Sequence, residues 1–148
     1  MKLEDEISQT KFKSEYLKAA LNIIYTSNWF TSQHSAKLKP HGITQQQYNI
    51  LRILRGQHPN PASIKLLKER MMDKMSDASR LVEKLRLKGL LERKICKADR
   101  RNVDVVITPK GLDLLTSLDH LDDNFKDIIA LNKDEVHQLN ELLDKLRG

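Results

Sequence analysis

The periodicity of the sequence changes between residues 63 and 108, and this change constrains the fold more than any other feature. Ser63 and Ser76 each precede a short segment with apolar residues at helical spacing, and only a brief turn separates the two segments. Two strand-like runs follow at 91–96 and 103–108, and apolar residues alternate with a period of two in the second. The stretch predicts a helix-turn-helix followed by a hairpin.

Two longer helices are predicted before this stretch. From Phe12 to about Lys39 there is no proline or glycine, and apolar residues form a wide helical stripe that needs more than one neighbour. Thr44 is expected to cap a second helix, 45–55, that ends at Gly56. The residues that this second helix should bury are Tyr48, Leu51 and Leu54.

The two helices of the helix-turn-helix have definite predicted limits. The first runs from Ser63 to about Met71, and the second from the capping residue Ser76 to a stop at Gly89. The second helix should turn Ala78, Leu81, Val82 and Leu85 inward. Three methionines, Met71, Met72 and Met75, are expected to line the turn and to pack beneath the second helix.

The C-terminal part of the chain predicts two further helices. Thr108 caps the first of them, with Pro109 in its first turn, and Asn132 or Lys133 begins the second. The residues expected to be buried are Leu114, Leu118, Leu121, Phe125 and Ile128 in the first, and Val136, Leu139, Leu143 and Leu146 in the second. Together with the first helix, these stripes are wider than one small subunit covers, so a homodimer is expected.

Composition sets the broad class of the protein. The 148 residues, 39% hydrophobic and 31% charged, suit one globular domain. The sequence shows neither a run long enough to span a membrane nor a secretory signal. Cys96 is the one cysteine, which excludes an internal disulfide and fits a reducing cytoplasm.

Charge is distributed unevenly along the chain. Residues 61–110 carry 14 basic and 7 acidic groups, a balance of +7, whereas residues 111–148 carry 4 and 9, a balance of −5. A basic middle beside an acidic tail indicates that the middle segment binds a polyanion and that the tail has a different role. The alternative is an ordinary solvated surface.

A helix in the major groove reads bases with side chains near its N-terminus. Arg80 can donate two hydrogen bonds to a guanine, while Asp77 can accept from cytosine or hold Arg80. The predicted DNA-contacting residues of this helix are Ser76, Asp77, Ser79, Arg80 and Lys84. Helix capping and solvation are the alternatives for each of them.

The hairpin tip carries a second group of candidates. Asp99 and Arg101 are two residues apart, so in an extended chain the carboxylate lies beside the guanidinium and orients it. An arginine held in this way suits a narrow minor groove, with Lys97 and Arg100 near the flanking phosphates. The alternative is a solvated turn with an exposed ion pair.

These motifs resemble the MarR family of transcriptional regulators. The matching stretches are ITQQQYNILRIL, SDASRLVEKLRLKGLLER and DRRNVDVVITPKG. The resemblance implies a mainly α (α+β) fold: a single domain, 1–148, with a winged helix-turn-helix lobe at 43–108 and long dimerisation helices at 1–40 and 109–148. It also implies a recognition helix from Ser76 and a wing whose Arg101 is positioned by Asp99. A cleft for a small-molecule effector is implied between the dimerisation helices and the winged helix-turn-helix lobe.

Aromatic residues are the candidates for that cleft. They are Tyr25, Trp29, Phe30 and Tyr48. Residues of this kind at helical spacing are more often plain core, although Trp29 lies off the main stripe and is the best single candidate. Cys96 is either an oxidisable sensor beside basic residues or inert packing.

No catalytic or cofactor pattern stands out in the sequence. The histidines lack close metal spacing, and there is no glycine-rich phosphate loop, paired-carboxylate site or nucleophile–base set. We therefore expect no metal, no cofactor and no enzymatic activity.

The leading functional hypothesis is sequence-specific binding of double-stranded DNA at a palindromic operator. A cytoplasmic homodimer would act as a transcriptional repressor whose affinity a small ligand changes. The alternative is a dimeric winged-helix protein-interaction module without specific DNA binding, and an enzyme that binds small molecules stands third.

Overall fold

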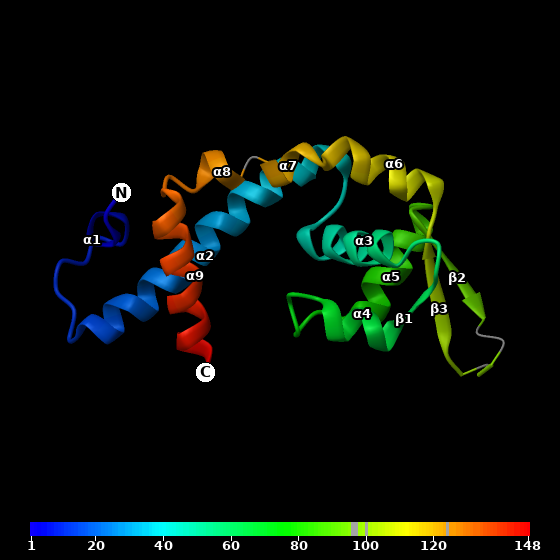
Figure 1. Cartoon of the computed structure of the whole chain (residues 1–148), viewed down its shortest axis with the longest axis horizontal. Helices are drawn as coiled ribbons and strands as arrows, with labels where there is room; N and C mark the ends of the chain where they lie inside the picture. Colours follow the sequence, from blue (N-terminus) through cyan, green and yellow to red (C-terminus); the bar gives the residue numbers. More distant parts are fainter. Residues whose placement is uncertain (96–97, 100, 124) are drawn as a thin grey trace. The chain divides into compact units, whose positions relative to one another are not determined.

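The computed structural model describes all residues except 96–97, 100 and 124. The elements are α1 (Leu3–Glu6), α2 (Glu15–Leu38), η1 (Lys39–His41), α3 (Gln45–Gln57), β1 (Ala62–Ser63), α4 (Ile64–Arg70), α5 (Ala78–Leu87), β2 (Leu91–Ile95), β3 (Val103–Ile107), α6 (Pro109–Leu118), α7 (His120–Asp123), α8 (Phe125–Ile128) and α9 (Lys133–Arg147). Helices dominate, and the strands form a small antiparallel sheet in the order β1-β3-β2 (Figure 1). The predicted mainly helical fold with a winged helix-turn-helix is confirmed.

The chain divides into two compact units, Met1–Leu112 and Asp113–Gly148. The first holds α1 to α5, the sheet and the start of α6, and the second holds the remainder of α6 and α7 to α9. The assignment of 1–40 and 109–148 to dimerisation stays a prediction.

The hairpin predicted from the two strand-like runs is present. Leu91 pairs with Ile107 and Ile95 with Val103, and the side chains of Val105 and Ile107 are buried. The strand β1, which pairs Ala62 with Val105, was not predicted, because two residues are too few to show a period.

Helices α3, α4 and α5 lie beside the sheet and share its core (Figure 1). Buried side chains come from every one of these elements: Tyr48, Leu51, Leu54, Leu67, Ala78, Val82, Leu85, Leu91, Val105 and Ile107. The predicted inward faces of α3 and α5 are therefore confirmed, except that Leu81 is only half-buried.

Local hydrogen bonds set the limits of α3. Thr44 caps its start, since the Thr44 hydroxyl accepts from the Gln47 N–H and the Gln47 side chain accepts from the Thr44 N–H. The predicted end at Gly56 is wrong, because the helix continues to Gln57. It stops at His58, where the following Pro59 favours extended backbone.

The long helix α2 starts later than predicted. Ser14 is its cap, and the Ser14 hydroxyl accepts from the Leu17 N–H at 3.1 Å, so Phe12 lies outside the helix. The short helix α1 was not predicted. An ion pair of 2.5 Å between Lys18 and Glu4 joins it to α2.

The turn between α4 and α5 differs from its prediction. Ser63 caps α4 as expected, with its hydroxyl accepting from the Leu66 N–H. Met71 is buried, but Met72 and Met75 are 88% and 93% exposed, so the prediction that they pack beneath α5 is wrong.

The predicted continuous helix after Thr108 is wrong. The Thr108 hydroxyl caps α6 as expected, accepting from the Gly111 N–H, but α6 ends at Leu118. The Asp119 N–H donates to the Thr116 carbonyl, an i to i+3 bond that tightens the last turn. Of the residues expected to be buried here, Leu118 and Leu121 are buried, and Leu114, Phe125 and Ile128 are half-buried.

Helix α9 has the predicted start but a more open apolar face. Asn132 and Glu135 form a reciprocal capping box at its N-terminus. Val136 and Leu143 are half-buried, whereas Leu139 and Leu146 are exposed, so the predicted burial of the last two within the chain is wrong.

Candidate nucleic-acid interface

Helix α5 begins one residue later than predicted. Its cap is Asp77, whose Oδ1 accepts from the Arg80 N–H at 3.1 Å, so the prediction that Ser76 caps the helix is wrong. The Ser76 hydroxyl instead hydrogen-bonds the Asp73 carboxylate, and this bond holds the pKa of Asp73 below its usual value. The cap therefore involves only the backbone N–H of Arg80, and the Arg80 guanidinium takes no part in it.

The outer face of α5 presents the predicted polar side chains. Ser79, Arg80 and Lys84 are exposed, whereas Ala78, Val82 and Leu85 on the opposite face are fully buried. The helix is thus anchored by one face and offers the other, with two cations one turn apart, to an outside partner. Contact between these side chains and DNA stays a prediction.

Removing the cap should destabilise the lobe. Asp77→Ala is expected to lower the free energy of unfolding by about 1 kcal/mol, because the Arg80 N–H loses its acceptor. Urea unfolding measures the change, and Asp77→Asn, which can still accept, is the matched control. Equal stability of the alanine variant and the wild type would contradict the cap.

Glu83 joins α5 to the hairpin. Its carboxylate accepts from the Arg86 guanidinium at 2.8 and 3.1 Å and lies 3.0 Å from the Arg93 guanidinium on β2. The hydrogen bonds from Arg86, with the charge of Arg93, hold the pKa of Glu83 below its usual value. The i, i+3 spacing of Glu83 and Arg86 signals the first contact in the sequence, but only the folded hairpin brings Arg93 close.

Neutralising Glu83 should strengthen non-specific duplex binding. Glu83→Gln releases Arg86 and Arg93 toward phosphates and removes one negative charge, so affinity for random-sequence duplex should rise about threefold at low salt. Fluorescence anisotropy across a salt series measures the effect. Glu92→Gln removes the same charge from β2, and an equal rise in that variant would contradict a special role for Glu83.

The wing tip is built differently from its prediction. The Asp99 Oδ1 accepts from the Arg101 backbone N–H at 3.0 Å, and Oδ2 accepts from the Asn102 side chain at 3.2 Å. The expected pairing of the carboxylate with the guanidinium is wrong, because the chain turns here and the carboxylate closes the turn. Arg101 is exposed. Cys96, Lys97 and Arg100 lie outside the described residues.

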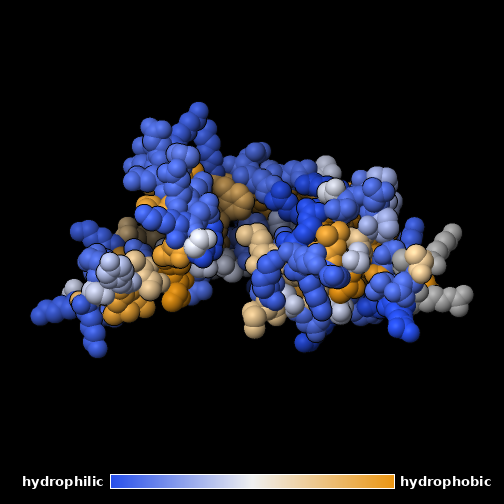
Figure 2. Space-filling model, turned by 60° about the horizontal axis from the view of Figure 1, so that its bottom comes forward, coloured by the Kyte–Doolittle hydropathy of each residue, from blue (hydrophilic) through white to orange (hydrophobic). Residues whose placement is uncertain are grey.

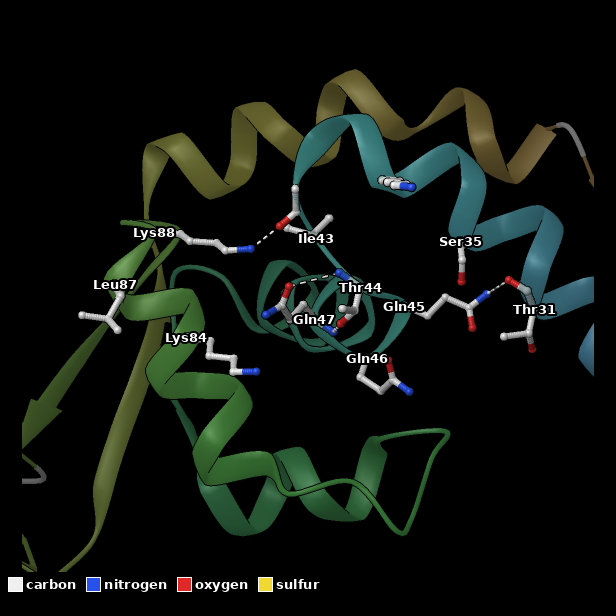
Figure 3. A pocket seen from close by; sticks show the side chains of 12 residues that line it. Thr31, Ser35, Ile43, Thr44, Gln45, Gln46, Gln47, Lys84, Leu87 and Lys88 are labelled. Atoms are coloured by element: carbon white, nitrogen blue, oxygen red, sulfur yellow. Dashed lines mark hydrogen bonds between the residues drawn. The ribbon is translucent and has the colours of Figure 1, made fainter.

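A pocket of about 790 Å³ lies between the C-terminal half of α2, the start of α3 and the end of α5 (Figure 3). The Gln45 side chain donates to the Thr31 carbonyl at 3.3 Å, and the Lys88 ammonium donates to the Gly42 carbonyl. The lining is polar and basic: Thr31, Ser35, Lys39, Gly42, Ile43, Thr44, Gln45, Gln46, Gln47, Lys84, Leu87 and Lys88.

The sequence model of the MarR family matches residues 43–103 of this chain. The chain belongs to the MarR family. The chain is similar to one transcriptional regulator and two solved structures in particular. The HTH-type transcriptional regulator MhqR of Bacillus subtilis is 28% identical over 108 residues, which are 72% of this chain and 73% of MhqR. The structure of a MarR transcription factor from Planctomyces limnophilus is 28% identical, with a TM-score of 0.68 over 90% of this chain and 98% of that one. The S. aureus MepR–DNA complex shares the fold, with a TM-score of 0.75 at 20% identity over 92% and 97% of the two chains.

In this MarR-family chain the matched segment runs from just before α3 to the first residue of β3. It contains α5 and Glu83, so the candidate interface lies almost entirely within it. Membership in a family of transcription regulators supports the prediction that the chain is not an enzyme.

The aromatic candidates lie apart from the larger pocket. Tyr25 and Trp29 line a hollow of about 200 Å³ beside α1, where the Tyr25 hydroxyl donates to Glu6 at 2.6 Å and its pKa is raised by that bond. Phe30 packs edge-on against Trp29 at 6.0 Å, and Tyr48 is buried with His34 5.5 Å away. The larger pocket is lined instead by polar residues at the starts and ends of helices. Hydrophobic periodicity in the sequence gives no indication of such residues.

Within the part of the chain that the structure describes, no helix is both long and apolar enough to cross a membrane. Outside positions 96–97, 100 and 124, no group of three or more His, Cys, Asp or Glu side chains is arranged to hold a metal ion.

Proposed function

We propose that this MarR-family chain binds double-stranded DNA sequence-specifically and regulates transcription in the cytoplasm, where it acts as a repressor. The observation that carries the proposal is the outer face of α5, which offers Ser79, Arg80 and Lys84 from a helix whose other face is buried. The exposed Arg101 on the adjacent hairpin suits a neighbouring minor groove. Lys97 and Arg100 belong to the same proposed interface.

We infer that two copies form the working unit through the segments 1–40 and 109–148. Apolar side chains lie open on the surface, and Figure 2 shows several hydrophobic patches among the polar side chains of one face. They include Tyr16, Leu17 and Ile24 on α2, and Leu139, Leu142 and Leu146 on α9. A two-fold dimer would present two α5 helices about 34–36 Å apart to a palindromic operator.

The pocket beside α5 supports regulation by a small ligand. Lys39, Lys84 and Lys88 line it, so a small organic anion suits its charge. Because the pocket borders both α2 and the recognition helix, a ligand that prefers one arrangement of these helices would change the population that binds DNA.

Selection from random-sequence duplexes tests DNA binding. We expect an enriched palindrome at moderate salt, bound by a dimer in sedimentation analysis. Absence of enrichment would reject specific binding and favour a protein-interaction module. The acidic Asp77 at this end of α5 does not by itself favour that module, because its carboxylate caps the helix.

The pocket has its own test. A panel of small organic acids is expected to contain compounds that release the selected duplex. Lys39→Met should weaken their effect about tenfold while leaving duplex affinity unchanged, because Lys39 lies on η1 and outside α5. Competition binding measures both quantities, and an unchanged response of the variant would place the ligand elsewhere.

A further inference from the structure

Two exposed methionines flank the N-terminal end of the recognition helix. Met72 and Met75 are 88% and 93% exposed, and both lie in the turn between α4 and α5. Met71, the residue before them, is buried and anchors the turn to the core. Single exposed apolar side chains are common on protein surfaces, so the significance of these two depends on their place next to the N-terminal end of α5.

Hydrogen bonds hold this turn in one conformation. The Met72 N–H donates to the Asn49 side chain on α3 at 3.0 Å. The Met75 N–H donates to the Asp73 carboxylate at 3.0 Å, and the Ser76 N–H donates to the Asp73 carbonyl at 3.3 Å. The turn therefore presents the two side chains from a fixed backbone.

The charged side chains of the turn hydrogen-bond other groups of the turn or the end of α4. The Ser76 hydroxyl and the Met75 N–H hydrogen-bond the Asp73 carboxylate and lower its pKa, so it stays ionised with its oxygens occupied. The Lys74 ammonium donates to the Glu69 carbonyl at 2.5 Å. Asp73 and Lys74 are exposed as well, and Met72 and Met75 are the apolar side chains that the turn exposes.

We propose that Met75, with Met72 beside it in the turn, contacts thymine methyl groups in the major groove and so contributes to the choice of operator. This inference rests on the proposed function. Met75 lies two residues before the cap of α5, at the end of the helix that enters the groove. The thymine C5-methyl is the apolar group on a base edge there, and an unbranched thioether adapts its shape to such a surface.

Thymine-to-deoxyuridine exchange tests the contact, because it removes one methyl group and leaves base pairing intact. The probes are a palindrome selected with the full-length wild-type chain and copies of it with each thymine replaced in turn. Wild type should lose about fourfold in affinity at one or more thymines of each half-site. Met75→Ala should bind the parent duplex more weakly and lose that sensitivity, whereas Met75→Leu, which stays apolar, should keep it.

The outcomes separate the two proposals. A selected palindrome with no deoxyuridine effect in wild type, or with the same effect in Met75→Ala and Met72→Ala, would overturn the methionine contact alone. Failure to select any palindrome would overturn the proposed function, and the contact with it. Equal melting temperatures of the variants and wild type exclude misfolding as the cause of lost sensitivity.

Discussion

The double variant Arg80→Ala, Arg101→Ala is expected to bind the selected palindrome at least about thirtyfold more weakly than wild type, since each arginine should contribute ~1–3 kcal/mol. Arg80 lies exposed in the first turn of α5, and Arg101 lies exposed on the hairpin tip. The reason for the large effect is that the two groups serve different grooves, so neither replaces the other.

Fluorescence anisotropy with the palindrome and with random duplex measures this loss. Loss of a base contact at Arg80 should reduce discrimination between the two duplexes, and loss of phosphate contacts should make the salt dependence shallower. Lys145→Ala removes a positive charge from α9 and serves as the control. Unchanged affinity of the double variant would favour the protein-interaction module.

Gly111→Ala is expected to lower the free energy of unfolding by about 3 kcal/mol. A Cβ on Gly111 would lie 2.3 Å from the Leu90 carbonyl oxygen and 2.7 Å from Ile107 Cγ1. The first of these atoms belongs to the backbone at the start of the hairpin and cannot rotate away. The first turn of α6 would have to move off the sheet.

Gly56→Ala is the matched control for this variant. Gly56 lies inside α3, and a Cβ there has no atom of another element within 4 Å. Alanine favours a helix over glycine, so this variant should be about 0.5–1 kcal/mol more stable than wild type. Urea unfolding of both variants gives the comparison, and equal stability of Gly111→Ala and wild type would contradict the close packing of α6 on the hairpin.

Local signals predicted much of the fold correctly. Thr44, Ser63 and Thr108 cap helices where the sequence placed them, because a cap hydrogen bond joins residues two or three positions apart. The two strands of the hairpin also lie where the sequence predicted them.

Errors arose where two local solutions compete. Both Ser76 and Asp77 can cap α5, and the choice depends on Asp73, which engages Ser76 in the turn. At the hairpin tip, Asp99 can pair with the Arg101 guanidinium or close the turn through its N–H, and the turning backbone selects the second. The tasks predicted for the Ser76 hydroxyl and the Asp99 carboxylate were wrong, and the DNA contacts of the candidate residues stay a prediction.

The sequence by itself determined most of the helices, the two strands of the hairpin, the inward faces of α3 and α5 and the basic segment, because these properties depend on neighbours within a few positions. Only the tertiary structure decided that Arg93 meets Glu83, that polar helix ends enclose the pocket, and that Gly111 touches the start of the hairpin. Each of these contacts joins residues from different elements, and their meeting depends on how the helices and strands pack against one another.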